Sequence, residues 1–201
     1  MEEEKDARIL LAEYAQKRGY DYATNSNFKR LISVTDSFLS RKFFLFEIEK
    51  GFWFFAADSF AGKAGSGSTF TGIYTTINMD PSFSCKIHIK ETLDGIFRWN
   101  RKKTGNPEID RQLTITTNQK SLPDNIIREG DIYEFKKIYD KVRPSYIVFQ
   151  NDYLPGLPAL NEKMIVGIET NYWVYLDDQL DVLIDKGLPL LKKICTAHIQ
   201  S

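Results

Sequence analysis

A change to period-two patterning in the middle of the chain limits the fold more than any other feature of this sequence. Every second residue of 44–48 is apolar, residues 52–57 are apolar on both faces, and residues 69–79 are rich in Thr, Ile and Tyr. Successive side chains of a β-strand point to opposite faces, so these segments predict three strands, of which the second is central. The connections at Gly51 and at 62–68 are short, which favours an antiparallel meander.

Residues 83–90 show the cleanest alternation in the chain. One face carries Phe83, Cys85, Ile87 and Ile89, and the other carries Ser84, Lys86, His88 and Lys90. This pattern is typical of a half-buried antiparallel strand with one solvent-facing, basic face. We therefore expect His88 to be a solvated histidine and not a general base.

Four segments follow the helical period, in which apolar residues recur at intervals of three and four. They are residues 2–18, 27–38, 124–139 and 177–186. Gly19 is predicted to end the first helix, and an interruption of the third is predicted near Gly130. Gly187 and Pro189 are predicted to end the fourth helix, since glycine favours a helix stop and proline a new start.

The order of these elements predicts the fold class and the domain organisation. Further strands are predicted at 113–117, 146–150, 164–169 and 172–176, with a polar loop at 98–107. Runs of sequential strands indicate an α+β fold, with antiparallel β-meanders packed by N-terminal, middle and C-terminal helices. The 201 residues suit a single domain, 1–201, within which two lobes (about 1–97 and 110–201) would be joined by the 98–109 loop.

The charge balance bears on possible partners and on location. Lys plus Arg and Asp plus Glu both number 27, so the formal net charge is zero. Nucleic acid is disfavoured as a partner, because affinity for it normally rests on a basic excess that neutralises phosphates. The segment Met1–Asp6 is acidic, unlike a signal peptide, and the apolar runs are far shorter than the roughly 20 residues of a membrane span. We expect a soluble, cytoplasmic protein.

No standard catalytic, cofactor or metal motif is present in the sequence. The only cysteines are Cys85 and Cys195 and the only histidines are His88 and His198, whereas a structural zinc site needs about four ligands. The glycine-rich segment 62–68 has its Gly-Lys pair first and precedes a β-branched segment, whereas a P-loop ends in Gly-Lys-Ser/Thr and opens a helix. We predict a mobile hairpin loop there, and no catalytic residue, cofactor or metal.

Clustered carboxylates leave acid–base chemistry open. The candidates are Glu47 with Glu49 on one strand and, at the start of the C-terminal helix, Asp177, Asp178, Asp181 and Asp185. Acidic residues at a helix start normally cap the helix and keep it solvated, and we favour that interpretation.

The basic and aromatic segment 97–103 is the strongest signal for binding. Aromatic rings can stack on bases, and nearby cations can contact phosphates. The binding residues predicted on this basis, with an extension onto the strand 83–90, are Lys86, His88, Lys90, Arg98, Trp99, Arg101 and Lys102. The competing interpretation is a solvated basic loop with Trp99 packed on the core.

Several stretches stand out together along the chain: Leu11–Tyr20, 51–57 with 73–77, Thr104–Asp110, and Trp173–Tyr175. Their order resembles a loose group of uncharacterised bacterial proteins with a domain of unknown function. The resemblance implies an N-terminal helix, an aromatic β-meander, a Thr-Gly-x-x-x-x-Asp segment before a second α+β lobe, and a bacterial origin. It implies no catalytic residues.

These observations favour a non-enzymatic binding or interaction module. A protein partner and a second copy of the chain both remain open. One alternative is a small-molecule or nucleotide-binding enzyme that uses the 62–68 loop together with nearby carboxylates. The other is a weak nucleic-acid binder that uses residues 86–103.

Overall fold

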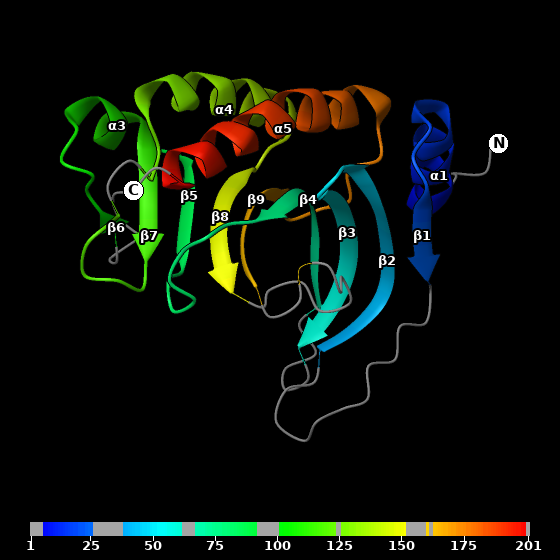
Figure 1. Ribbon diagram of the computed structural model, residues 1–201. Coiled ribbons are helices and arrows are strands. Elements are labelled where there is room, and N and C mark those ends of the chain that lie inside the picture. The colour runs from blue at the N-terminus through cyan, green and yellow to red at the C-terminus, as the bar shows by residue number, and fades with distance from the viewer. Residues whose placement is uncertain are drawn as a thin grey trace.

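Figure 1 shows the computed structural model of the chain, in which residues 6–25, 38–61, 67–91, 101–123, 126–151, 160 and 163–199 are described. Within these residues, nine strands form one antiparallel sheet in the order β1-β2-β3-β4-β9-β8-β5-β7-β6. The strands are β1 (Tyr22–Asn25), β2 (Phe38–Glu49), β3 (Phe52–Ala61), β4 (Gly67–Thr76), β5 (Cys85–Ile89), β6 (Arg101–Lys102), β7 (Leu113–Thr117), β8 (Tyr146–Asn151) and β9 (Met164–Thr170).

The helices of the described ranges are α1 (Ala7–Arg18), α3 (Pro107–Gln112), α4 (Glu129–Lys141) and α5 (Asp177–Ile199). The helices α4 and α5 lie side by side across one face of the sheet, whereas α1 lies beside β1 at one end (Figure 1). This arrangement confirms the predicted α+β class with antiparallel strands packed by helices. No helix in these ranges has the length and apolar character needed to cross a membrane.

The two parts of the chain contribute to the same sheet. The strands β2 to β4 follow one another as the predicted meander, and β1, which was not predicted, pairs with β2. The strand β4 then pairs with β9, the last strand in sequence, and not with the predicted next strand, β5. The strand β5 lies between β8 and β7. The prediction of a loop over 98–107 is wrong for Arg101 and Lys102, because their backbone pairs with β7 and forms the edge strand β6.

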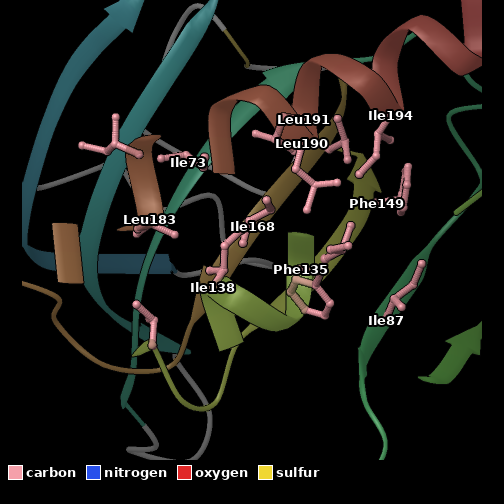
Figure 2. Packing of buried hydrophobic residues seen from close by; sticks show 14 of the residues in the cluster. Ile73, Ile87, Phe135, Ile138, Phe149, Ile168, Leu183, Leu190, Leu191 and Ile194 are labelled. Carbon is pink, nitrogen blue, oxygen red and sulfur yellow. The ribbon is translucent and has the colours of Figure 1, made fainter. Parts of the chain in front are cut away.

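The larger core fills the space between the helices and one face of the sheet, which we call the helix face. Every second residue of the central strands points into it, such as Phe54 of β3 and Ile73 of β4. Side chains of α4 and α5 meet these strands, among them Phe135, Ile138, Leu183, Leu190, Leu191 and Ile194 (Figure 2). Burying one such side chain fully contributes about 1.5–3 kcal/mol, so this layer supplies much of the driving force for folding.

The other face of the sheet, which we call the opposite face, has a smaller core of its own. It contains Phe55, Ala57, Phe70, Tyr74, Val148, Leu160 and Ile165. The strand β3 is therefore buried on both faces, which confirms the prediction that residues 52–57 form a central strand.

The pairing of β4 with β9 depends on two glycines. In register, Tyr74 lies opposite Gly167, and Gly72 lies opposite Glu169. A Cβ atom at Gly167 would lie 2.2 Å from Tyr74 Cδ1, and one at Gly72 would lie 2.6 Å from the Tyr74 hydroxyl. The Tyr74 ring thus lies close against the backbone at both glycines, and its hydroxyl donates a hydrogen bond to Glu169 (3.1 Å).

The helix α5 continues through Gly187 and Pro189, where the sequence predicted its end. A Cβ at Gly187 would lie 2.5 Å from Ile73 Cδ1, so the glycine lets the helix approach the sheet closely. A proline inside a helix costs about 3 kcal/mol, because a backbone hydrogen bond is lost and its ring crowds the preceding turn. Leu183 and Leu190 are fully buried on either side of this point, and their packing offsets the cost.

Two other helix predictions differ from the structure. The helix α4 begins at Glu129 rather than at 124 and includes Gly130 without interruption. Phe38, the last residue of the predicted helix 27–38, begins the strand β2, and residues 27–37 lie outside the described residues.

Residues 172–176 do not form the predicted strand. Hydrogen bonds that involve side chains hold this segment in place, and not backbone pairing with a neighbouring strand. The Trp173 indole N–H donates to Asp58 of β3 (2.7 Å), and the Val174 N–H donates to the Thr71 hydroxyl of β4 (3.2 Å).

The helix α1 is confirmed at its predicted C-terminal end. The Asp6 carboxylate accepts a hydrogen bond from the Arg8 N–H at its start (2.9 Å). Gly19 ends it with φ of 72°, in the left-handed region that favours glycine.

We expect Gly167→Ala to lower the free energy of unfolding by about 1–3 kcal/mol or more, because the new methyl group would overlap the Tyr74 ring. Urea unfolding followed by far-UV circular dichroism measures the change. The control is Gly130→Ala, whose Cβ would meet no atom within 4 Å; it should leave stability unchanged or raise it by up to about 1 kcal/mol. A Gly167→Ala protein that unfolds at the same urea concentration as the unsubstituted chain would contradict this account of the β4–β9 pairing.

Candidate functional site

Five of the seven residues that were predicted from the sequence to bind a ligand lie within the described residues. Arg98 and Trp99 lie outside the described residues. Residues 62–66 of the glycine-rich segment lie outside them as well, and Gly67 and Ser68 begin β4.

His88 is buried, so the prediction of a solvated histidine on a wet strand face is wrong. Its side chain is 2% exposed and meets the Tyr146 ring edge-to-face, with the ring centroids 5.9 Å apart. Lys86 is half-buried, and its Nζ lies 3.6 Å from the centroid of the same ring, as in a cation–π contact. The reason is the position of β5 inside the sheet, where Tyr146 of the neighbouring β8 lies against the polar side chains.

The remaining predicted residues are spread over different parts of the sheet. Lys90 is exposed beyond the end of β5, and its Nζ lies 3.4 Å from the Asp110 carbonyl oxygen. Arg101 lies in register with Thr116 of β7, which lies opposite Lys86, so Arg101 and Lys86 share a face two strands apart. Lys102, the next residue of β6, points to the other face. The basic surface predicted over 86–103 is therefore only partly formed by its described residues.

A row of buried and half-buried polar side chains crosses the opposite face of the sheet. In register, Thr114 lies opposite His88 on one side of β5, and farther along the sheet Tyr146 lies opposite Glu169. Glu169 is 5% exposed and accepts the hydrogen bond of Tyr74. Glu169 was not predicted from the sequence, although a single acid inside the largely apolar strand β9 was a usable signal. Hydrogen-bonded polar groups of this kind fix the positions of core side chains.

The clustered carboxylates join elements of the fold. Those of α5 reach α1 and α4 through Lys17–Asp177 (2.8 Å), Arg18–Asp181 (2.9 Å), Arg18–Asp185 (2.9 Å) and Lys141–Asp178 (2.5 Å). Glu49 pairs with Lys192 of α5 (2.5 Å), and Glu47 accepts a hydrogen bond from the Gly51 N–H (2.7 Å). These contacts hold helices and a turn in place, and none of these carboxylates lines the cleft between α3 and α4.

A cleft of about 970 Å³ lies between α3, the segment after β7 and the start of α4. Buried side chains of Ile109, Ile126 and Ile127 contribute an apolar lining. Polar and cationic side chains line the rest, among them Lys103, Thr104, Asn106, Lys120, Ser121 and Arg128.

The Thr-Gly-x-x-x-x-Asp segment builds one wall of this cleft. The Asp110 carboxylate accepts hydrogen bonds from the Thr104 N–H (2.8 Å) and hydroxyl (2.9 Å), which closes a turn. Gly105 sits inside the turn with φ of 86°, a value that other residues seldom adopt. Asn106 then caps α3 by accepting a hydrogen bond from the Glu108 N–H (2.9 Å). The segment therefore has a structural role: it orients the chain at the cleft.

A second wall, residues 118–123, is attached to the loop before β5. The Asn118 side chain accepts a hydrogen bond from the Ser84 N–H (2.9 Å) and donates one to the Ser82 carbonyl (2.7 Å). Lys120 thus extends from a segment whose backbone is held on its N-terminal side.

The start of α4 forms the third wall. The Asp131 carboxylate accepts a hydrogen bond from the Arg128 N–H (3.0 Å), and Asn106 donates to Glu129 (2.7 Å), which ties α3 to α4. Gly130 adds no side chain to the first turn. The N–H groups of a first turn have no partner inside the helix and carry a partial positive charge.

The charges at the cleft are unbalanced. Lys103, Lys120 and Arg128 are exposed, and none of them forms an ion pair within the described part of the chain. Glu129 is the acid among the lining residues, and Asn106 already donates to it. Three cations, side-chain donors and a helix start together suit an anion such as a phosphate or a carboxylate. The sequence pointed to the basic segment 97–103, which contains Lys103, but not to Lys120 or Arg128, because these residues lie far along the chain in segments with no local pattern.

The cysteines are poor candidates for nucleophiles. Both are free, and burial raises the pKa of the Cys85 thiol to about 12 and that of the Cys195 thiol to about 11. In the ranges that the structure covers, no group of three or more His, Cys, Asp and Glu side chains could hold a metal ion.

No family model, no curated protein and no solved structure matches this chain. The fold and the cleft therefore define a class in structural terms alone: an α+β protein whose described residues form one nine-stranded antiparallel sheet, with a cation-lined cleft at the α3–α4 end. The resemblance to a group of uncharacterised bacterial proteins stays a prediction.

We expect Asp110→Ala to lower the free energy of unfolding by about 1–3 kcal/mol, because two donors of Thr104 would lose their acceptor. Asp110→Asn keeps one side-chain oxygen as an acceptor and should retain at least half of that free energy. Chemical denaturation measures both variants. Equal stability of the alanine and asparagine variants would show that the turn does not depend on this acceptor.

Both thiols should react with iodoacetamide at pH 8 at least roughly 100-fold more slowly than a free cysteine, because their raised pKa values leave little thiolate. In about 8 M urea, a denaturing concentration, the labelling rate of both cysteines should rise to that of a free thiol. Mass spectrometry of labelled peptides distinguishes the two sites. Rapid labelling of Cys85 in the native protein would contradict its burial in β5.

Proposed function

We propose that the protein is a non-enzymatic binding module, and that the cleft between α3 and α4 binds a small anionic molecule. The observation that carries this proposal is that Lys103, Lys120 and Arg128 line one cleft, and that none of these three side chains forms an ion pair with another described residue. A hydrogen bond to a charged group contributes about 1.5–3 kcal/mol, so two or three of them support affinities between about millimolar and micromolar.

Two features support binding over catalysis at this site. The lining side chains are cations, amides and hydroxyls that can hold an anion, and the one carboxylate among them, Glu129, accepts a hydrogen bond from Asn106. The carboxylates that the sequence left open for acid–base chemistry contact α1, α4, α5 or a turn. The two free thiols, Cys85 and Cys195, also favour the cytoplasm as the proposed location.

Binding of pyrophosphate to the purified chain tests the proposal. We expect pyrophosphate to raise the melting temperature in a concentration-dependent way, because a ligand that binds the folded state stabilises it. The triple variant Lys103→Gln, Lys120→Gln, Arg128→Gln should weaken binding by at least about 100-fold in isothermal titration calorimetry, since it removes the charge-assisted contacts.

The matched control removes three exposed lysines that lie away from the cleft. The variant Lys50→Gln, Lys136→Gln, Lys193→Gln changes the net charge by the same amount and should bind pyrophosphate within about twofold of the unsubstituted chain. Equal losses in both triple variants would reduce the effect to overall charge and refute a site at the cleft.

A further inference from the structure

A second hollow adjoins the cleft. It has a volume of about 380 Å³ and lies between the segment after β4, the loop before β5 and the segment after β7. Ser121, Leu122 and Pro123 line both hollows, so the two hollows border the same short segment.

The second hollow differs from the cleft in its chemistry. Met79, Phe83, Leu122 and Pro123 contribute apolar side chains, and none of its lining residues is a lysine or an arginine. Asp80 is the one charged residue there, and its carboxylate accepts a hydrogen bond from the Ser82 N–H (2.8 Å), which lowers its pKa. A negative carboxylate at this position disfavours an anion and leaves the apolar side chains as the attractive part.

The segment between the hollows is supported from one side. The Asn118 side chain accepts a hydrogen bond from the Ser84 N–H and donates one to the Ser82 carbonyl, which fixes the chain just before this segment, and Leu122 packs against the main core. A ligand lying along Ser121–Pro123 would therefore contact a formed surface at both ends.

We propose that the ligand is an anion with an aliphatic tail, whose phosphate or carboxylate binds in the cation-lined cleft and whose tail lies in the hollow beside Met79 and Phe83. This inference rests on the proposed anion-binding function and adds the chemical class of the ligand. Transfer of the tail out of water contributes favourable binding free energy, and so do the charge-assisted contacts of the head with Lys103, Lys120 and Arg128.

A series of monoalkyl phosphates tests the proposal, with inorganic phosphate, ethyl, butyl and hexyl phosphate titrated into the full chain by calorimetry. Each buried methylene strengthens binding up to about fourfold, so hexyl phosphate should bind at least about tenfold more tightly than ethyl phosphate. Met79→Gln should reduce this gain while inorganic phosphate binds as before, because Met79 lines only the second hollow of the two.

A second measurement does not depend on a variant that must fold. Hexyl phosphate with a diazirine at the end of its chain should, after illumination, label the peptide that contains Met79 and Phe83. Labelling confined to other peptides, or equal affinities along the series, would overturn the tail site.

The outcomes separate this inference from the proposed function. If all members of the series bind equally well and the Lys103, Lys120 and Arg128 triple variant loses them all, the anion site stands and the tail site falls. If none binds the unsubstituted chain more tightly than the triple variant, both fall.

The same head and tail chemistry occurs in a membrane lipid and in a free molecule. Sedimentation with phosphatidylcholine vesicles, with and without phosphatidic acid, distinguishes these sources. Binding to the acidic vesicles without any dependence on chain length in the soluble series would assign the cations to a membrane surface and refute an enclosed tail.

Discussion

The pairing of β4 with β9 is the constraint on which the rest of the structure depends, because it joins the first meander to the second part of the chain. Glycines permit close contact on both faces of this pair. On the opposite face, the Tyr74 ring lies against the backbone at Gly72 and Gly167. On the helix face, Gly187 brings α5 against Ile73 of β4. Larger residues at these positions would push apart elements that are in close contact, and protein cores tolerate little extra volume.

The candidate cleft lies at the α3–α4 end of the molecule, away from the β4–β9 pair, yet the same sheet positions it. The strand β7 delivers residues 118–123, and Asn118 attaches them to the loop before β5. The helix α4 is held by its packing on α5, which also pairs Asp178 with Lys141. The position of each wall of the cleft is therefore fixed by a helix or strand that is itself packed in the fold, and the cationic side chains extend from these walls.

Much of the fold follows from local pattern, and the failures share one physical cause. The alternation in 44–48 and the apolar run 52–57 correctly predicted strands, and Gly19 correctly ended α1. Pro189 was wrongly expected to end a helix, because packing of Leu183 and Leu190 outweighs the local cost. His88 was wrongly expected to be exposed to solvent. Tyr146 of the neighbouring strand β8 covers it, and the sequence around His88 does not reveal this contact. A prediction from local propensity fails wherever burial by distant residues contributes more free energy than the local conformational preference.

The sequence by itself determined the α+β class and the main strands of the first meander, because the hydrophobic pattern that marks these elements involves neighbours within a few positions. The tertiary structure alone decided that β9 pairs with β4 and that Lys103, Lys120 and Arg128 line one cleft. Such contacts join residues that are far apart along the chain, and no short-range pattern encodes them. The candidate site is of the second kind, so it became visible only when the sheet order and the packing of α4 were known.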